Sequence, residues 1–251
     1  MNVNTLHNIV KFLKSKGKEP PFFYKLKYYP ETLKGEELNV KGKVELEGKG
    51  LPRLPDNLTV IGDLVIFDND SGELPKNLTV TEYLGLSRNR MTYLPSDLKV
   101  GEEISVTQLD STLTISSGFK LPPMVEFSDL KDLKLRGDWS RVERIRIQRM
   151  KLERFPEVSK PLRKVWLYKA YIDSFPDGLV VEDFHIVTCL DKIKELPRNL
   201  TITGVLEVTP TYEGKRIPEN AAYELRQALE ERGGRINKIE YNLGAGIYIE
   251  A

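Results

Sequence analysis

The sequence is poor in the residues that build catalytic and metal sites. Among its 251 residues it has one cysteine, Cys189, and two histidines, His7 and His185. A single cysteine forms no disulfide within the chain and excludes cysteine-only metal sites. A chain so poor in cysteine is typical of a reducing compartment, so we expect a cytoplasmic protein.

Local spacing of reactive residues gives no catalytic motif. No Ser-His-Asp or Cys-His set stands close together in the sequence, and the fragment Gly244-Ala245-Gly246 is explained by a hairpin turn rather than by a phosphate-binding loop. His7 and His185 lie too far apart along the predicted fold to share a zinc ion. We therefore expect a protein that is not an enzyme and that holds no cofactor and no metal.

The chain also lacks a surplus of either charge and lacks long apolar runs. Its 38 lysines and arginines balance 37 aspartates and glutamates, so only local patches can attract a polyanion. No run reaches the roughly 18 apolar residues of a membrane span. The segment from Met1 to Gly17 alternates polar and apolar side chains and lacks the apolar core of a signal peptide.

A repeat of about 20 residues is the strongest positive signal. Leu54-Pro55, Leu74-Pro75 and Leu94-Pro95 stand one repeat apart, and the first two are followed by a near copy of Asn-Leu-Thr-Val. The phase returns at Phe155-Pro156, Phe175-Pro176, Leu196-Pro197 and Ile217-Pro218, at nearly the same spacing. Such self-similarity predicts a stacked repeat architecture.

Each repeat also contains a short alternating strand. Residues two apart share a face of a strand, so each unit points two aliphatic side chains inward. The predicted inward pairs are Val44/Leu46, Leu64/Ile66, Leu84/Leu86, Ile104/Val106, Leu133/Leu135, Ile145/Ile147, Val165/Leu167, Phe184/Ile186 and Leu206/Val208. A unit of this length is too short for a full outer helix, so we expect the chain to return in extended or polyproline-like form, or as a second line of strands through 58–60 and its equivalents.

These motifs carry a family resemblance. Leu84-x-Leu86-x-x-Asn89 fits the leucine-rich-repeat pattern, and Leu-Pro-x-Asn-Leu-Thr-Val resembles the leucine-rich-repeat proteins of tailed bacteriophages. It is also similar to the LPX repeats of secreted bacterial effectors. The resemblance covers Val40 to Pro218 and implies a recognition scaffold. For a phage protein it implies an inhibitor that interacts with a host protein, such as a defence component or a regulator.

Some LPX effectors carry a separate ubiquitin-ligase domain with a Cys-x-Asp motif, which Cys189-Leu190-Asp191 is similar to. Here the motif lies inside a repeat, and no helical domain of adequate length remains. We therefore interpret Cys189 as a packed structural residue.

The predicted fold is a mainly β repeat solenoid, a leucine-rich-repeat array of about 8–9 short parallel strands with terminal capping helices. Residues 1–40 form an N-terminal cap, with a helix over 4–16 and an aromatic-basic segment over 22–29. That segment is typical of a capping strand or of a surface that stacks on single-stranded nucleic acid. Residues 41–218 form the solenoid, with an irregular unit at 108–130. Residues 219–251 form a helix-hairpin cap.

The strand residues that point away from the core form the predicted partner-binding face. Its middle is basic and aromatic, and tryptophan, tyrosine and arginine are the residues most often found at binding hot spots. The candidates are Lys134, Arg136, Arg144, Arg146, Gln148, Lys164, Trp166, Tyr168 and His185. We expect a protein partner. The alternatives are nucleic-acid binding through the basic strip, which salt would weaken steeply, an LPX effector without its ligase domain, and a merely solvated charged face. The oligomeric state stays open.

Overall fold

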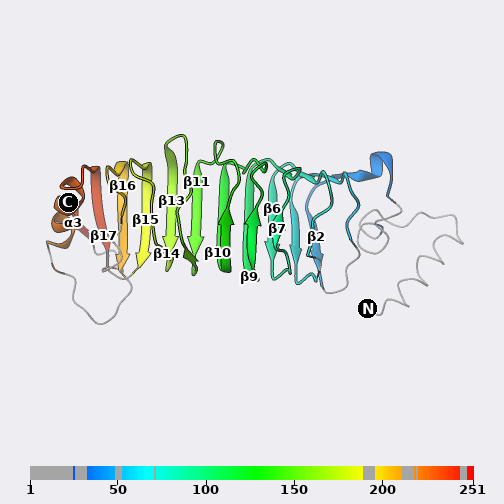
Figure 1. Ribbon diagram of the computed structural model, residues 1–251, viewed down its shortest axis with the longest axis horizontal. Helices are drawn as coiled ribbons and strands as arrows, with labels where there is room; N and C mark the ends of the chain where they lie inside the picture. The colour runs from blue at the N-terminus through cyan, green and yellow to red at the C-terminus, as the bar shows by residue number, and fades with distance from the viewer. Residues whose placement is uncertain are drawn as a thin grey trace, which may run out of the picture.

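The chain winds as a parallel β-solenoid of about eight turns, so the predicted solenoid is confirmed. The computed structural model describes residues 25, 33–48, 53–70, 72–188, 196–210, 218, 220–243 and 248–251. In Figure 1 the strands stand side by side in one row along the long axis of the molecule.

One side of the coil is a sheet of twelve strands, which we call the long sheet. Its neighbours follow the order of the chain and pair in parallel, except that the last strand is antiparallel and that β7 (Tyr93–Leu94) pairs with the end of β9. The other members are β2 (Val44–Glu47), β4 (Leu64–Phe67), β6 (Tyr83–Ser87), β9 (Glu103–Ile115), β10 (Met124–Leu135), β11 (Arg144–Gln148), β13 (Leu162–Tyr168), β15 (Val180–Thr188), β16 (Thr201–Pro210), β17 (Arg235–Asn242) and β18 (Tyr248–Glu250).

A second line of strands runs along another side of the coil, which is one of the forms of the return that the sequence left open. A short helix, η2 (Gly35–Leu38), leads into its first strand. The line contains β1 (Asn39–Lys41), β3 (Thr59–Ile61), β5 (Thr79–Val80) and β8 (Lys99–Val100). In later turns its place is taken by the first residues of β15 and β16, where Val181 pairs with Ile202. A separate pair, β12 (Lys151–Leu152) and β14 (Tyr171–Ile172), lies on a third side.

The core is one continuous strip inside the coil. The predicted inward pairs from Val44/Leu46 to Ile104/Val106 are all buried, as are Leu58, Leu78, Leu98 and Leu200 from the repeated Leu-Pro-x-x-Leu wording. Full burial of such a side chain contributes about 1.5–3 kcal/mol. Because a leucine of one turn is covered by the turns on either side, no turn is stable by itself.

A left-handed residue bends the chain in six successive turns; it follows the strand in four of them and lies within β9 and β10 in the other two. Asp68, Arg88, Gln108, Asp129, Arg149 and Lys169 have φ between 47° and 56°. We call this line the left-handed corner. The next residue points into the coil and is Asn69 or Asn89 in two turns and an apolar residue in the others. Asn89 Oδ1 accepts a hydrogen bond from the backbone N–H of Asn69 at 3.1 Å. Asn89 Nδ2 donates to the backbone carbonyl of Ile66 at 2.9 Å. Asn69 and Asn89 therefore form a short asparagine ladder at this corner.

The predicted register is wrong in the middle of the long sheet. The structure places Val125 and Phe127 between Ile104/Val106 and Ile145/Ile147, where Leu133/Leu135 was expected. Strand β10 is twelve residues long and continues around the corner at Asp129, so only its first half belongs to the face that β11 extends. Leu133 and Leu135 lie in the second half and pair with Leu113 and Ile115 of β9.

The predicted irregular unit at 108–130 contains the end of β9 and the start of β10. The pairing of these two strands shifts by one residue between Leu130 and Asp132. Asp110 and Ser111 of β9 thus lie opposite the single residue Lys131 of β10. This arrangement of two residues against one is a β-bulge.

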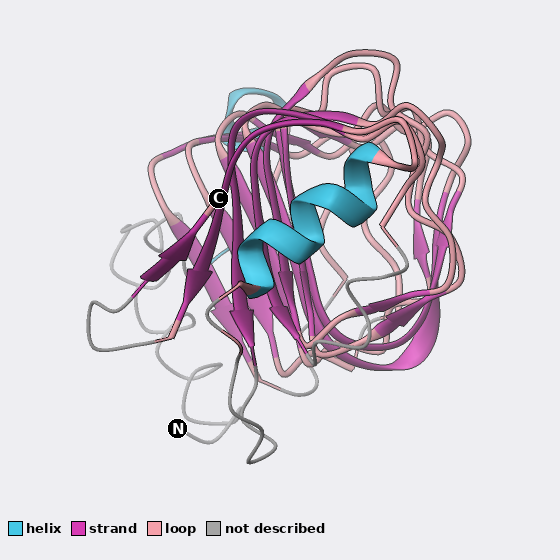
Figure 2. Ribbon diagram, turned by 90° about the vertical axis from the view of Figure 1, so that its left-hand side faces the viewer, coloured by secondary structure: helices cyan, strands magenta, loops and turns pink. Residues whose placement is uncertain are grey.

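The C-terminal end carries the helix and the hairpin that the sequence predicts after Pro218. Helix α3 (Ala221–Glu230) buries Ala221, Ala222, Leu225 and Leu229 and lies across the end of the coil (Figure 2). Strand β17, however, joins the long sheet in parallel with β16, so the solenoid continues past the expected boundary at residue 218. Among the described residues no helix is long and apolar enough to cross a membrane.

Three predictions fall outside the described residues. They are the N-terminal helix over 4–16, the aromatic-basic segment over 22–29 apart from Lys25, and the environment of Cys189.

Replacing Asn89 with alanine tests how much its two hydrogen bonds stabilise the left-handed corner. The substitution removes both hydrogen bonds of a buried side chain and leaves two backbone groups without these partners, so we expect a loss of about 2–4 kcal/mol in the free energy of unfolding. Urea unfolding measures it. The control is Asp110→Ala at an exposed position, which should change stability by less than about 0.5 kcal/mol. Equal stability of the two variants would contradict this account of the corner.

Candidate partner-binding face

The outer face of the long sheet carries one row of side chains that follow each other from strand to strand. Pairing places Glu126 beside Ser105 and Arg146, then Trp166 beside Arg146, then His185 and Glu207. We call Ser105, Glu126, Arg146, Trp166, His185 and Glu207 the central row. Its members lie at equivalent positions of successive turns because the inward pairs stack in register.

The first half of the central row is joined by polar contacts around Glu126. The Ser105 hydroxyl donates to this carboxylate at 3.4 Å and Gln148 Nε2 donates to it at 2.8 Å. Arg146 forms a looser ion pair with Glu126 at 3.7 Å, and its guanidinium carbon lies 4.7 Å from the centre of the Trp166 ring. At this distance the cation and the ring attract each other.

The second half continues the same chain of contacts. The Trp166 and His185 ring centres are 6.1 Å apart. His185 Nδ1 lies 2.8 Å from a Glu207 carboxylate oxygen, and Asn242 Nδ2 donates to the other Glu207 oxygen at 2.9 Å. The central row is therefore a continuous series of interacting side chains rather than a set of independent solvated groups.

At the N-terminal end of the central row, the Tyr83 ring lies over Gly85, the register partner of Ser105. A Cβ added at Gly85 would lie 2.8 Å from the Tyr83 ring, so the ring occupies the space that any other residue would fill. Burial raises the pKa of Tyr83, while its hydrogen bond with Ser105 lowers it. Burial, followed by the neighbouring Glu126 carboxylate, raises the pKa of Glu103. Acidic and polar groups therefore border the row on this side.

Trp166 is partly buried within the face. Arg146 lies over its ring, and Lys164 Nζ lies 5.9 Å from the ring centre. Its indole nitrogen is fully covered and has no hydrogen-bond partner among the described residues. An unsatisfied buried donor costs about 1–3 kcal/mol. The tryptophan is thus held in place by cations and keeps one hydrogen-bond donor unused.

Seven of the nine predicted candidates come together on three adjacent strands. They are Arg144, Arg146 and Gln148 on β11, Lys164, Trp166 and Tyr168 on β13, and His185 on β15. Arg144 pairs with Lys164 and Gln148 with Tyr168, so the basic and aromatic positions form adjacent rows.

Lys134 and Arg136 do not belong to this group. Lys134 lies in the second half of β10 and pairs with Thr114. Lys134 and Arg136 line a different groove, of about 430 Å³, beside Trp139 and Arg154. The sequence interpretation missed Glu126 and Ser128, which occupy the two places that it gave to Lys134 and Arg136. Counting one repeat back from Ile145 leads to Val125, and this spacing was the signal for the correct register.

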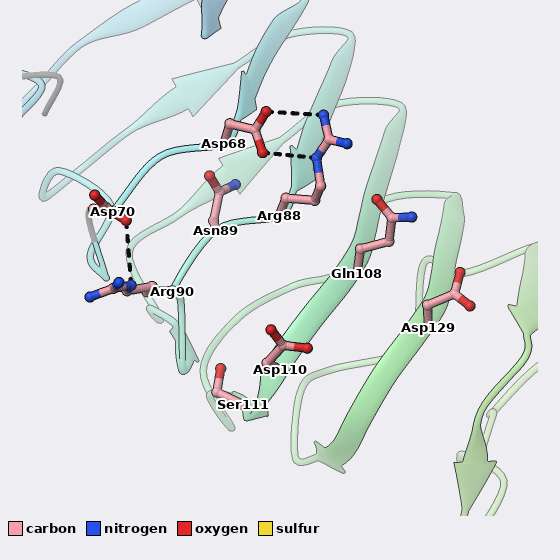
Figure 3. A pocket seen from close by; sticks show the side chains of 9 residues that line it. All are labelled: Asp68, Asp70, Arg88, Asn89, Arg90, Gln108, Asp110, Ser111 and Asp129. Carbon is pink, nitrogen blue, oxygen red and sulfur yellow. Dashed lines mark hydrogen bonds and ion pairs between the residues drawn. The ribbon is translucent and has the colours of Figure 1, made fainter. Parts of the chain in front are cut away.

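A second groove, of about 740 Å³, follows the left-handed corner (Figure 3). The sequence interpretation did not single it out. Its charged side chains pair across adjacent turns, with Asp68 to Arg88 at 2.9 Å and Asp70 to Arg90 at 3.4 Å. Much of its charge is thus neutralised within the protein. No group of histidine, cysteine, aspartate or glutamate side chains within the described ranges is arranged to hold a metal ion.

Comparison of the chain with protein-family models, with curated proteins and with solved structures finds no match. The function must therefore be argued from the residues of this chain.

The titration of His185 reports on the contacts of the central row. Burial, followed by the charge of Lys164, holds the pKa of His185 below its ordinary 6.5, while Glu207 opposes both effects. We expect Lys164→Met to raise this pKa and Glu207→Gln to lower it, as followed by NMR of the imidazole protons. The His185→Asn variant assigns the signal. A pKa unmoved by both substitutions would contradict the described contacts.

The lowered pKa of His185 also determines how the stability of the folded protein depends on pH. Because the folded pKa is depressed, the unfolded chain takes up the proton first as the pH falls through 6.5. The contribution of His185 to stability is therefore complete above that pH and declines below it.

Proposed function

We propose that this protein is a non-enzymatic scaffold that binds another protein on the outer face of β11, β13 and β15. The observation that carries the proposal is Trp166, which stands in the centre of the face between Arg146, Lys164 and His185. Tryptophan and arginine dominate the binding energy of many protein interfaces.

The rigidity of the face supports this proposal. Its side chains extend from a continuous parallel sheet, and contacts with neighbouring turns already hold Arg146, Gln148 and His185. Ordering side chains at an interface costs roughly 0.5–1.5 kcal/mol for each flexible one. A face whose side chains are held in advance binds a partner with less of this cost.

We further propose that the solenoid is a leucine-rich-repeat array of the bacteriophage type. The support is the Leu-x-Leu strand with its asparagine ladder and the Leu-Pro-x-Asn-Leu-Thr-Val wording. On this proposal the partner is a host protein, such as a defence component or a regulator, and the encounter takes place in the bacterial cytoplasm. An LPX effector without its ligase domain is the alternative from the same resemblance.

Nucleic-acid binding is the second candidate function. Arg144 and Lys164 lie side by side and favour a phosphate backbone. Carboxylates interrupt the basic region on both sides, at Glu126 on β10 and at Asp183 on β15. A nucleic acid running along the array would therefore meet like charges within one or two strands of the basic region.

A capture experiment tests the proposal. Tagged protein is incubated with bacterial lysate beside the variant Arg146→Ala/Trp166→Ala and the control Tyr93→Ala/Lys99→Ala, which changes the same kinds of residue elsewhere on the coil. We expect one stoichiometric protein with the wild type and the control, and at least a tenfold loss with the first variant. Retention of that protein by the first variant would disprove the proposed face. Recovery of nucleic acid alone, released by moderate salt, would favour the second candidate.

A further inference from the structure

The basic region of the face contains positive charges that form no ion pair with a carboxylate in the described chain. Arg146 pairs with Glu126 and Arg149 pairs with Asp129. Arg144, Lys164 and Lys169, in contrast, form no ion pair within 4.0 Å in the described parts of the chain. Lys164 and Lys169 lie near the aromatic rings of Trp166 and Tyr168 instead, at 5.9 and 5.6 Å.

Three acidic neighbours are already engaged, and a fourth, Glu103, interacts electrostatically with Arg144 without an ion pair within 4.0 Å in the described chain. Glu126 accepts from Gln148 and pairs with Arg146, and Glu207 is held by His185 and Asn242. Asp183 of β15 is the register partner of Lys164, and its Oδ1 accepts a hydrogen bond from the Val205 backbone amide at 3.2 Å. The three cations therefore remain available to a carboxylate from outside.

These cations bracket two aromatic rings along the strand direction. Arg144 at the start of β11 pairs with Lys164 of β13, Trp166 and Tyr168 follow on β13, and Lys169 lies at the left-handed corner. With about 3.3 Å per strand residue, the two ends are about 17 Å apart, while neighbouring strands are only about 4.8 Å apart. We call this strip, defined by Arg144, Lys164, Trp166, Tyr168 and Lys169, the basic window.

The shape of the basic window selects an extended polypeptide that runs along the strands. About five or six extended residues span its length. A ligand that runs across the strands leaves the window after one step and meets Glu126 on one side or Asp183 on the other. The favourable path therefore follows β11 and β13.

We propose that the partner docks with an extended acidic segment, in which carboxylates at both ends flank an apolar or aromatic residue. This inference rests on the proposed function and names the chemistry of the partner. One acidic end pairs with Arg144 and Lys164, the other with Lys169, and the central residue packs on Trp166 and Tyr168. When the segment binds, one of its oxygens displaces Arg146 from the Trp166 ring. This oxygen accepts a hydrogen bond from the indole nitrogen of Trp166, which has no partner among the described residues of the free protein.

Synthetic peptides test this directly. The probe is a fluorescently labelled peptide with the sequence Glu-Asp-Gly-Phe-Gly-Asp-Glu, and its control carries glutamine and asparagine in place of the acids. Fluorescence anisotropy is recorded up to millimolar protein at low and at physiological salt. We expect binding of the acidic peptide, at least tenfold weaker binding of the neutral one, and a change in tryptophan emission that is lost in Trp166→Phe.

Charge-reversal variants locate the site. Arg144→Glu/Lys164→Glu should weaken binding at least tenfold. The matched control Lys41→Glu/Lys99→Glu makes the same change of net charge on β1 and β8, in the second line of strands. It should alter binding less than twofold. Equal weakening by both variants would mean that bulk charge attracts the peptide and would overturn the proposal.

Three further outcomes also decide the question. Equal binding of the neutral peptide, or no binding of the acidic one up to millimolar protein, overturns the acidic segment. Tighter binding of a single-stranded DNA of about 20 nucleotides, competing with the peptide, assigns the basic window to nucleic acid. If capture of a lysate protein still requires Arg146 and Trp166, the proposed function stands even when the acidic segment fails.

Discussion

The structure depends on one constraint: a turn of about 20 residues cannot bury its own apolar edge and must stack in register on its neighbours. Stacking places the inward side chains in rows, with Leu58 above Leu78 and Leu98, and it does the same to the outward ones. The contacts Glu126–Arg146, Arg146–Trp166 and Asp129–Arg149 all join residues one repeat apart. The surface rows are therefore a direct consequence of how the core is built.

Much of the fold could be predicted because the repeat is written in the sequence. Leu58 and its equivalents indicated a second line of strands as one form of the return, and the segment after Pro218 indicated the terminal helix. The register failed where two alternating stretches of β10 follow one another without a break. Leu133/Leu135 looks more like a repeat strand than Val125/Phe127, and periodicity alone cannot tell which stretch faces the long sheet. Only the spacing of one repeat from Ile145 distinguishes them.

The candidate site was predictable as a list but not as an arrangement. Outward positions follow from alternation, so Arg146, Trp166 and His185 could be named in advance. Which of them are engaged depends on neighbours one turn away, and Glu126 was missing from the list because of the register error. Arg146 and Arg149 each have a carboxylate partner, whereas Arg144, Lys164 and Lys169 form no ion pair within the described part of the chain. A net charge of +1 thus hides a local surplus of positive charge.

The central claim is that a protein partner contacts the outer face of β11, β13 and β15. Site-specific photo-crosslinking in bacterial lysate tests it most directly, with a photoreactive side chain at Val187, beside Tyr168, and a second at Lys99 on β8 for comparison. The account predicts one crosslinked protein from position 187 and none from position 99. The same product from both positions, or no protein product from position 187, would contradict it.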